Sequence, residues 1–444
     1  MSTDPRETLA SAPMSALQVV AIAVTIGLTA LDGFDVLSIS FASPGIAAEW
    51  GIDRAALSVV LSMELFGMAV GALALGNLAD RLGRRPTMLL CLVLMTVGMF
   101  MVTGVRQITG LEVWRFTTGL GIGGLLATAN AVAAEFSNLR RRNLSVALMA
   151  VGYPIGAVVG GSIVKVLLHD HDWRAVFYLG GSITAVFIPV LLLVVPESVH
   201  WLARKQPPQA LQRINKVLAR MGHAAIDSLP PVTAQVRDRA VADIFSPALR
   251  LTTVLCASAC FFHMMTFYFL LKWIPKIVAD MHFPAAAAAG VLVWANVGGA
   301  TGGALLGVLS QKIGLKPLTI AVMLLSTVLV ILFGHAGANL NELSLLCALA
   351  GFFTNAGIVG LYAIYAQAFP THVRATGTGV AIGLGRGGAA LGPIAAGYLF
   401  NWGYALPSVA TYIALGSLLA AAVVALLPLN NQSQAITLLR SANS

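Results

Sequence analysis

GNLADRLGRR, residues 76–85, decides the fold, because this short polar segment separates two long apolar runs and recurs later in the chain. It places Asp80 at the expected end of one helix and three arginines in a tight turn around Gly83. Charge-assisted hydrogen bonds in such a turn can lock neighbouring helices and release them when the protein changes conformation. A basic loop with no further role is the alternative, but the spacing of the charges favours a gating motif. Its predicted members are Gly76, Asp80, Arg81, Gly83, Arg84 and Arg85.

A degraded copy of this segment, GVLSQKIGLK, occupies residues 307–316 and begins 231 positions later (307 − 76). Gln311 stands where the first copy has its acid, so we expect a weaker latch in the second half. A similar offset of 232 residues (374 − 142) relates two further segments. The matched residues are Arg142 with Arg374 and Gly156 with Gly388. Arg142 and Arg374 therefore join the predicted gating motif, and the chain has the duplicated halves that are common in membrane carriers.

The composition is that of a membrane protein. Of the 444 residues, 58% are hydrophobic and 10% are charged, whereas a soluble domain carries roughly 25% charged residues. A helix needs about 20 mostly apolar residues to cross a bilayer. The chain offers about twelve such runs, so we predict an all-α membrane protein. The predicted spans are residues 17–40, 56–79, 87–105, 110–135, 144–168, 174–195, 248–272, 284–309, 317–335, 342–369, 376–400 and 404–427.

One long polar segment, residues 196–247, divides the apolar runs into six and six. We predict an N-terminal six-helix bundle over residues 1–195, a linker loop over 196–247, and a C-terminal six-helix bundle with a short tail over 248–444. Basic residues gather in the linker and in the other even-numbered loops. The positive-inside rule then places both termini and the linker in the cytoplasm. We expect a multi-pass protein of a bacterial inner membrane.

Several classes of function are disfavoured. The net charge of +9 comes from alternate loops and not from one basic stripe, so nucleic acid is not an expected partner. No GxxxxGK[ST] motif occurs, which argues against ATP-driven transport. The four cysteines lie in apolar runs and HDHDW (169–173) lies in a short turn, so we expect neither disulfides nor a metal site. We predict a monomer that is not an enzyme, has no cofactor, and draws its energy from a proton gradient across the lipid bilayer.

Five ionisable residues lie inside the predicted spans, namely Asp32, Asp35, Glu64, Arg115 and Arg386. Such a side chain costs roughly 2.5–3.5 kcal/mol at the bilayer centre, so it generally faces a cavity or a partner. Counting residues from the predicted helix ends puts the first four at similar depth, in the outer half of the N-terminal bundle. A carboxylate beside Arg115 stays ionised, whereas one that loses this partner in an apolar cavity takes up a proton.

We therefore predict a proton-coupling group made of Asp32, Asp35, Arg115 and Glu64. Asp32 and Asp35 are its leading proton carriers, and their spacing of three residues places them on one helix face. A static structural bridge is the alternative for this pair. Glu64 is equally well interpreted as a structural or auxiliary residue.

Arg386 lies near the middle of the eleventh predicted helix, and no acid of the C-terminal helices lies at that depth. Its guanidinium can hold a carboxylate through two parallel hydrogen bonds, so we predict that it binds a small organic anion. Pairing with the N-terminal carboxylates is the alternative. Aromatic and amide side chains on the seventh and tenth helices suit a flat ligand, although they are also ordinary packing elements. These further substrate-binding candidates are Tyr362, Tyr365, Asn355 and His263.

Four motifs together resemble those of the major facilitator superfamily, over nearly the whole chain. They are GNLADRLGRR, Arg115 followed by GLGIGG, the glycine-rich GYPIGAVVGG, and PESVHWL at the end of the sixth predicted helix. The resemblance implies about twelve membrane helices in two pseudo-symmetric six-helix bundles. It also implies transport by alternating access, in which a central site opens to each side of the membrane in turn.

Within that superfamily the chain resembles the aromatic acid:proton symporters, which carry 4-hydroxybenzoate, benzoate, muconate and related acids. The segments concerned are LDGFD around Asp32 and Asp35, the following AAEWGI, FYFLLKWIPKIV with Trp273 and Pro275, and RATGTGVAIGLGRGGAALGP at 374–393. Lys272 departs from the family pattern, in which a small polar or neutral residue is expected. This departure concerns the identity of the substrate.

These observations predict a proton-coupled symporter that imports a small organic acid, with an aromatic carboxylate as the leading interpretation. Proton-coupled efflux of drugs or metabolites is the alternative, because GYPIGAVVGG loosely resembles the glycine-proline motif of antiporters. Arg386 favours an anion, whereas an exporter of cationic drugs would need an unpaired acid in its place. A transporter-like receptor would need an added signalling domain, for which residues 196–247 are too few.

Overall fold

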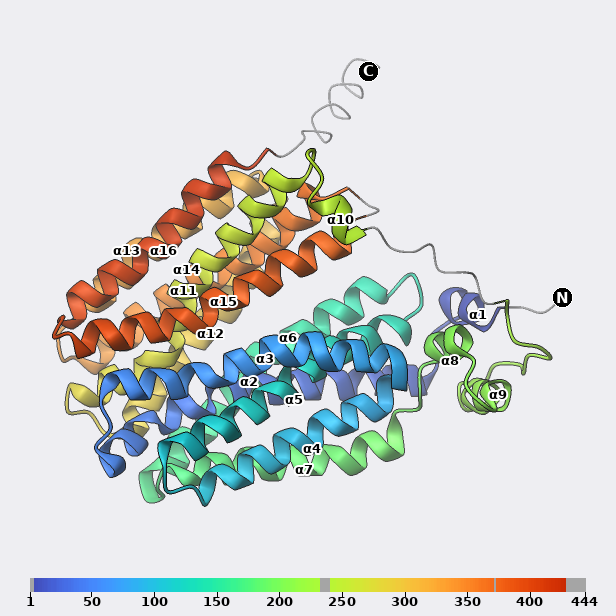
Figure 1. Cartoon of the computed structure of the whole chain (residues 1–444), viewed down its shortest axis with the longest axis horizontal. Coiled ribbons are helices and arrows are strands. Elements are labelled where there is room, and N and C mark those ends of the chain that lie inside the picture. The colour runs from blue at the N-terminus through green and yellow to red at the C-terminus, as the bar shows by residue number, and fades with distance from the viewer. Residues whose placement is uncertain (1–3, 232–239, 371–372, 429–444) are drawn as a thin grey trace, which may run out of the picture.

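The computed structural model describes residues 4–231, 240–370 and 373–428, and the regular secondary structure in these ranges is helical. Twelve of the helices have 20 residues or more and form two groups of six (Figure 1). The first group comprises α2 (Ala16–Trp50), α3 (Arg54–Leu82), α4 (Arg84–Thr103), α5 (Ile108–Glu135), α6 (Arg142–Asp170) and α7 (Arg174–Val194). The second comprises α11 (Arg250–Asp280), α12 (Ala285–Leu309), α13 (Leu315–Gly334), α14 (Leu340–Ala368), α15 (Arg374–Asn401) and α16 (Leu406–Leu426).

Eleven of these twelve helices are both long enough and apolar enough to cross a membrane. The remaining one, α15, has 28 residues, which is ample length, but it is rich in glycine and contains Arg386. The predicted all-α membrane fold is therefore confirmed.

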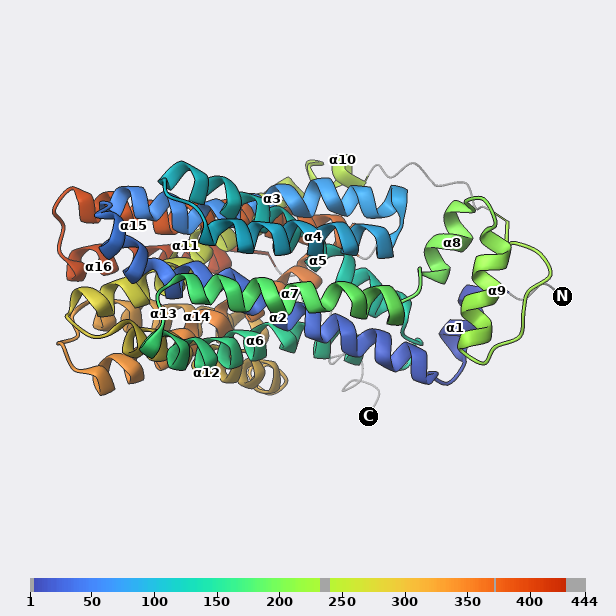
Figure 2. The same cartoon turned by 90° about the horizontal axis from the view of Figure 1, so that it is seen from below.

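The two groups of helices are packed in the same way. In the first bundle α3 lies along α5 and α2 lies along α6, and in the second bundle α12 lies along α14 and α11 along α15. The remaining helices are paired in the same way, with α4 against α7 in the first bundle and α13 against α16 in the second. Figure 2 shows the bundles from a second direction. The structure thus contains the two pseudo-symmetric six-helix bundles that the duplicated sequence predicts.

Glycines at matched positions let the paired helices approach each other closely. A side chain at Gly156 of α6 would collide with the carbonyl oxygen of Ala30 on α2. Gly388 of α15, its counterpart in the sequence repeat, is equally close to the carbonyl oxygen of Phe261 on α11. Small residues at helix crossings compensate for the lack of a hydrophobic driving force within a membrane. The internal repeat of the sequence is therefore a repeat of helix packing.

Two helices are longer than the sequence predicts. The first and seventh spans were predicted to end at residues 40 and 272, but α2 ends at Trp50 and α11 at Asp280. Each continues through a proline, Pro44 in α2 and Pro275 in α11. Residues near the ends of the predicted spans consequently lie deeper than expected. Asp35, for example, is 15 residues from the end of α2 (50 − 35) and not five.

The continuation of α2 through Pro44 has a local explanation. A proline has no N–H, so the carbonyl four residues earlier, that of Ser40, loses its usual helical partner. The hydroxyl of Ser43 donates to this same oxygen at 2.8 Å. The helix therefore keeps the carbonyl satisfied inside an apolar environment, where an unpaired polar group is costly.

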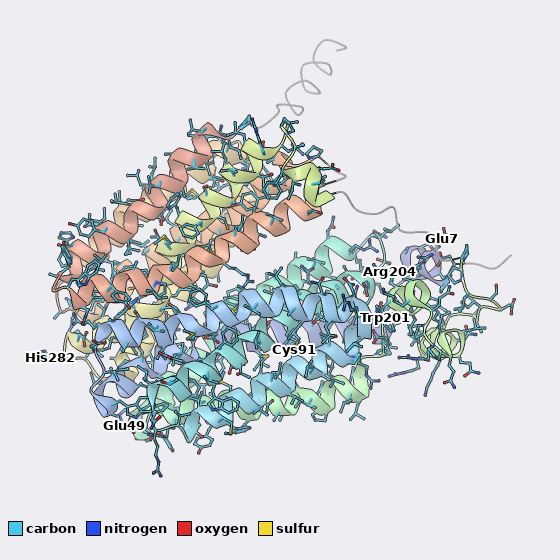
Figure 3. The ribbon with its side chains drawn as sticks, viewed as in Figure 1. Glu7, Glu49, Cys91, Trp201, Arg204 and His282 are labelled. Carbon is cyan, nitrogen blue, oxygen red and sulfur yellow. The ribbon has the colours of Figure 1, made fainter. Side chains whose placement is uncertain are left out.

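The bundles meet at one end and diverge at the other (Figure 1). They lie together at the end that carries Glu49 and His282, labelled in Figure 3, and we call this the Glu49 end. They diverge toward the end that carries α8 and α9, which we call the α8 end. Contacts between the bundles are made by α3 with α15, α6 with α12, and α2 with α11.

The polar segment between the bundles contains three short helices, α8 (Val199–Lys205), α9 (Ala210–Arg220) and α10 (Ala240–Ile244). The amphipathic pattern QALQRINKVLARMG forms α9, which buries Ile214, Val217 and Leu218. A further short helix, α1 (Pro5–Ser11), is joined to the loop before α6 by a hydrogen bond from Leu139 N to Ala10 O of 3.0 Å. Most of the predicted C-terminal tail lies outside the described residues.

Candidate functional site

A cluster of buried charges joins the two bundles. Glu64 of α3 and Arg115 of α5 form an ion pair in which neither side chain is exposed. Lys272 of α11, in the other bundle, lies 3.3 Å from the same carboxylate (Nζ to Oε2) and also donates to the main-chain oxygen of Val36 on α2. The Glu64 carboxylate therefore contacts two cations, one from each bundle. Low dielectric makes such contacts strong, but it also makes an unpaired member costly.

Arg115 has further contacts inside the N-terminal bundle. It donates to the main-chain oxygen of Asp35 at 3.2 Å and to the sulfur of Met99 at 3.4 Å. Its guanidinium carbon also lies 5.4 Å from the ring centre of Phe177, within the range of a cation–π contact. The arginine is thus held on several sides by α2, α3, α4 and α7.

The expected partner of Arg115 differs from the observed one. The sequence suggested that a carboxylate of Asp32 or Asp35 lies against the guanidinium, but Glu64 occupies that place and only the backbone of Asp35 contacts Arg115. The side chains of Asp32 and Asp35 are 1% and 0% exposed, and none of their four carboxylate oxygens has a hydrogen-bond partner among the described residues. Depth along a helix cannot reveal which way a side chain points. The structure nevertheless brings all four predicted residues into one region.

Arg386 lies at the middle of α15, 12 residues after its start (386 − 374), as the sequence predicts. It is half-buried and forms no ion pair within the described residues. Its charge acts electrostatically on Asp32 and Tyr153 of the N-terminal bundle, and on Tyr268 and Tyr362 of its own bundle. Arg386 therefore lies near residues of both bundles.

The other predicted substrate contacts divide into two kinds. Tyr362 is 37% exposed and lies near Arg386, so its side chain is available to a ligand. His263, by contrast, is fully buried, with its ring nitrogens 2.9 Å from Ser417 Oγ and 2.8 Å from Thr354 O. It joins α11, α14 and α16, and it has no ring nitrogen left for a substrate.

The polar groups of Tyr365 and Asn355 likewise form hydrogen bonds inside the C-terminal bundle. The hydroxyl of the fully buried Tyr365 donates to Cys256 O at 2.9 Å, and the amide of Asn355 donates to Gly299 O at 2.7 Å. These bonds tie α14 to α11 and α12. In this conformation these polar groups take part in helix packing, as do those of His263, and the role of all three residues as substrate contacts stays a prediction.

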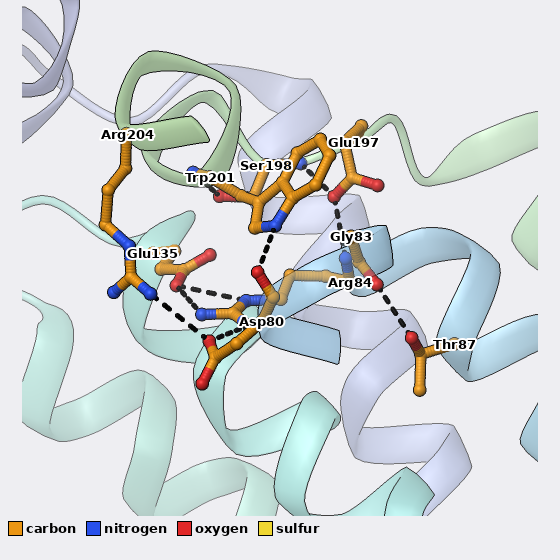
Figure 4. Close-up of polar contacts among 9 residues, drawn as sticks. All are labelled: Asp80, Gly83, Arg84, Thr87, Glu135, Glu197, Ser198, Trp201 and Arg204. Carbon is orange, nitrogen blue, oxygen red and sulfur yellow. Dashed lines mark hydrogen bonds and ion pairs between the residues drawn. The ribbon is translucent and has the colours of Figure 1, made fainter. Parts of the chain in front are cut away.

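The predicted gating motif forms a compact polar cluster at the α8 end (Figure 4). Arg84 is its centre, since it pairs with Asp80 at 2.6 Å and with Glu135 of α5 at 3.1 Å. Arg204 of α8 approaches Asp80 at 3.7 Å, and the indole of Trp201 donates to the main-chain oxygen of Asp80 at 3.1 Å. The cluster joins α3, α4, α5 and α8 within one half of the molecule.

Glu197, from the PESVHWL motif, completes this cluster. Its Oε1 accepts from the N–H groups of Arg84 at 3.0 Å and Ser198 at 2.8 Å. Gly83 has φ +116°, and a side chain there would collide with the Glu197 carboxylate. Burial raises the pKa of Glu197, although the two N–H donors oppose this shift. A glycine is required at position 83 on both steric and conformational grounds.

The remaining members of the predicted motif are less closely tied. Arg81 is exposed and Gly76 lies against Ala127 of α5 without a clash. Arg142 is half-buried with an unpaired Nε, and Arg374 donates to Phe369 O at 3.4 Å. The structure does not bring these two arginines into the Arg84 cluster.

The second copy of the motif keeps one interaction of the first. Arg85 donates to the main-chain oxygen of Leu192 on α7, and its counterpart Lys316 donates at 2.9 Å to the oxygens of Ala425 and Leu427 at the end of α16. Gln311 and its neighbours form no ion pair in the part of the chain that the structure describes. The contrast agrees with the predicted loss of the acid.

Several residues of both sites were not predicted. Lys272 was noticed only as a departure from a family pattern, and its position within an apolar span was the signal that could have identified it. Glu135, Trp201 and Arg204 lie in three separate segments of sequence, so nothing in their spacing indicated that they would gather around Asp80.

Comparison with known proteins identifies the family. The model of the Major Facilitator Superfamily matches residues 25–337, more than half of the chain. The chain belongs to the Major Facilitator Superfamily. It is accordingly a multi-pass membrane transporter and not an enzyme.

Curated members of the superfamily that resemble the chain are transporters of aromatic acids. A gallate transporter of Pseudomonas putida is 27% identical, over 95% of this chain and 94% of its own. The 4-hydroxybenzoate transporter PcaK of Pseudomonas aeruginosa is 31% identical, over 89% of each. A 3-(3-hydroxy-phenyl)propionate transporter of Escherichia coli is 29% identical, over 91% and 93%.

Solved structures of the superfamily share the fold. The xylose transporter XylE of Escherichia coli, in an inward open conformation, superposes with a TM-score of 0.73 at 17% identity, over 94% of this chain and 97% of its own. A bacterial homolog of the human lysosomal transporter Spinster, inward-facing and occupied, gives 0.71 at 14% identity over the same shares. At these identities the likeness concerns architecture alone.

Proposed function

We propose that the protein imports a small aromatic carboxylate together with protons, by alternating access of a site between its two bundles. One observation carries the proposal: two fully buried carboxylates, Asp32 and Asp35, have no hydrogen-bond partner among the described residues, and Arg386 of the other bundle lies near Asp32. A group that can take up a proton and a group that can hold an anion thus share one region. The named substrates of the relatives supply the chemical class.

The orientation follows from the basic residues. Arg81, Arg84 and Arg204 lie at the α8 end, which we place in the cytoplasm because cytoplasmic loops carry the excess of arginine and lysine. The Glu49 end then faces outward. Since the bundles diverge toward the α8 end, the structure corresponds to a carrier closed on its outer side.

Asp32 and Asp35 are proposed as the proton carriers. An ionised carboxylate without hydrogen bonds is expensive to bury, so the environment of both side chains suits the neutral acid. When the bundles move and the site opens to water on the other side of the membrane, hydration stabilises the charged carboxylate and the proton leaves. Glu64 is a weaker candidate, because its carboxylate already pairs with Arg115 and lies 3.3 Å from Lys272.

Arg386 is proposed to bind the substrate carboxylate. It has no protein anion as an ion-pair partner in the described structure, and its planar fork matches the two oxygens of a carboxylate. Tyr362 lies close enough to contact an aromatic ring held there. The polar cluster around Arg84 is proposed to act as a latch, which controls the rate of rocking and not the affinity of the site.

The proposal is tested by uptake into proteoliposomes of labelled 4-hydroxybenzoate, benzoate and gallate, with succinate as an aliphatic control. We expect at least one aromatic acid to be concentrated when the outside is acidic, and the concentration to vanish when a proton ionophore is added. Carriage of succinate alone would reject the aromatic class. Uptake that the ionophore leaves unchanged would reject proton coupling.

A further inference from the structure

Lys272 is a cation of the C-terminal bundle, and within the described residues its one carboxylate partner belongs to the N-terminal bundle. Its side chain is fully buried, and its Nζ reaches across the interface to Glu64 at 3.3 Å and to the main-chain oxygen of Val36. Every described contact of this ammonium with an oxygen therefore crosses from one bundle to the other. Any rocking of the bundles about their interface must stretch or break these contacts.

A second ion pair marks the same interface closer to the outer surface. Arg54 of α3 lies 2.9 Å from Asp280 of α11, and its guanidinium also lies over the ring of Phe400 on α15. Along α3 this arginine precedes Glu64 by ten residues (64 − 54), and along α11 Asp280 follows Lys272 by eight (280 − 272). The helices α3 and α11 are thus linked at two depths, by a half-exposed pair near the surface and by a dry pair below it.

Opening of the outer side has unequal consequences for the members of the deep pair. Glu64 keeps Arg115 as a partner, because both residues belong to the N-terminal bundle and move together. Lys272 loses its only carboxylate and becomes an uncompensated cation inside the cavity. A cation that has lost its protein carboxylate and faces the opened cavity is a site at which another carboxylate can bind.

We infer that Lys272 receives the carboxylate of the incoming acid when the protein is open to the outside, and that Glu64 replaces that carboxylate when the outer side closes. The inference rests on the proposed function, since it takes the substrate to be an organic anion. It adds a second cation to the C-terminal side of the pathway, beside Arg386. It also explains how an anion favours the outward-open state, because the ligand replaces the interaction that opening removes.

The test uses Lys272→Met, with Lys276→Met as the matched control on the same helix. Lys276 pairs with Asp280 of its own helix, so its removal deletes the same charge while Asp280 keeps its contact with Arg54 of the other bundle. Opening is reported by Ile277→Cys, introduced into each protein, because Ile277 is 5% exposed and lines a cavity with Arg54, Asp280 and Phe400. A membrane-impermeant maleimide labels this cysteine, while the four native cysteines are buried.

Without any ligand, we expect Lys272→Met to raise the rate of labelling about threefold or more, since the deep link between the bundles is lost. Lys276→Met should leave the rate close to that of the parent protein. Equal labelling of the parent and Lys272→Met would overturn the linking role. Lys272→Arg, which keeps the charge, serves to separate loss of the link from misfolding, because it should restore slow labelling.

With external 4-hydroxybenzoate, or whichever aromatic acid the parent carries, we expect the KM for uptake to rise about tenfold or more in Lys272→Met, as for loss of a hydrogen bond to a charged group. The acid should speed labelling of the parent but not of Lys272→Met. An unchanged KM would overturn the role in substrate binding. If the parent carries no aromatic acid, the proposed function fails and this binding role fails with it, whereas labelling without ligand still decides the link.

Discussion

Arg115 forms an ion pair with the carboxylate of Glu64 and a 3.2 Å hydrogen bond with the backbone oxygen of Asp35, so that the Asp35 carboxylate itself is left without a partner. The two acids therefore have opposite environments although they lie in one cluster. The Glu64 carboxylate lies against two cations, whereas the buried Asp35 carboxylate has no hydrogen-bond partner among the described residues. Because their environments differ in this way, we assign proton transfer to Asp35, and to Glu64 a structural role that links the two bundles.

Asp35→Asn is expected to abolish concentrative uptake, and Asp32→Asn to reduce it, because an amide cannot exchange a proton with the cavity. Exchange of labelled for unlabelled acid across the membrane, which needs no net proton movement, should survive in Asp35→Asn. Both activities are measured in the same proteoliposomes. Concentrative uptake at the parent level by both single variants would refute the assignment.

Arg386→Lys is expected to weaken substrate binding about tenfold, because the charge remains but the planar fork is lost, and Arg386→Ala should weaken it further. The rival role for Arg386 is pairing with Asp32, whose environment it influences. Substrate affinity of purified Arg386→Ala is therefore compared with that of Arg386→Ala combined with Asp32→Asn. Recovery of affinity in the double variant would favour the structural pairing, because neutralising the acid removes an uncompensated charge.

Asp80→Asn and Arg84→Ala are expected to slow turnover about tenfold while leaving substrate affinity near that of the parent, because both residues belong to the cluster at the α8 end. Arg81→Ala is the matched control, since this arginine is exposed and lies outside the cluster. Stopped-flow exchange gives the rate, and equilibrium binding gives the affinity. A large loss of affinity at normal turnover would show that the cluster is not a latch.

Glu197→Gln is expected to change the pH dependence of stability. Burial raises the pKa of Glu197, so its contribution to folding is greatest at low pH and is lost as the pH rises through the raised pKa. The glutamine stays neutral at every pH and keeps the oxygen that accepts from Arg84 and Ser198. Its melting temperature relative to the parent should therefore be more favourable at pH 8 than at pH 5.

The control for this experiment is Glu7→Gln, which neutralises an exposed acid on α1. The melting temperature of Glu7→Gln should differ from that of the parent by a small amount that is the same at pH 5 and at pH 8. A difference between Glu197→Gln and the parent that does not vary with pH would mean that Glu197 titrates in the folded protein as it does in the unfolded chain.

The arrangement of the helices could be predicted from the sequence because its signals are local or repeated. Twelve apolar runs mark the spans, and the copy of GNLADRLGRR together with the match of Gly156 to Gly388 predicts equivalent bundles. Helix ends were less predictable in α2 and α11, where a proline follows the predicted end of the span within a few residues. In α2 the hydroxyl of Ser43 satisfies the carbonyl that Pro44 leaves unpaired, and this compensation extends the helix to Trp50.

Four members of the buried region could be predicted, but Lys272 and the pairing could not. Counting residues from the predicted ends placed Asp35 too near its helix end, and it says nothing about rotation around each helix axis, which decides that Arg115 meets Glu64. Lys272 belongs to the other half of the chain, so its contact with Glu64 depends on how the bundles meet. Similarly, His263 looked available to a ligand until the structure placed Ser417 and Thr354 against its two nitrogens.

The direction of coupling is the central claim, and it is tested most directly by reversing the pH gradient. Labelled aromatic acid is added to liposomes that contain the parent protein, once with an acidic exterior and once with an acidic lumen. The pH difference has the same size in both experiments. Liposomes without protein give the passive entry of the neutral acid, which is subtracted. Symport predicts protein-dependent accumulation only when the exterior is acidic, and loss of that accumulation in Asp35→Asn. Protein-dependent accumulation only with an acidic lumen would contradict the account and identify a proton-coupled exporter.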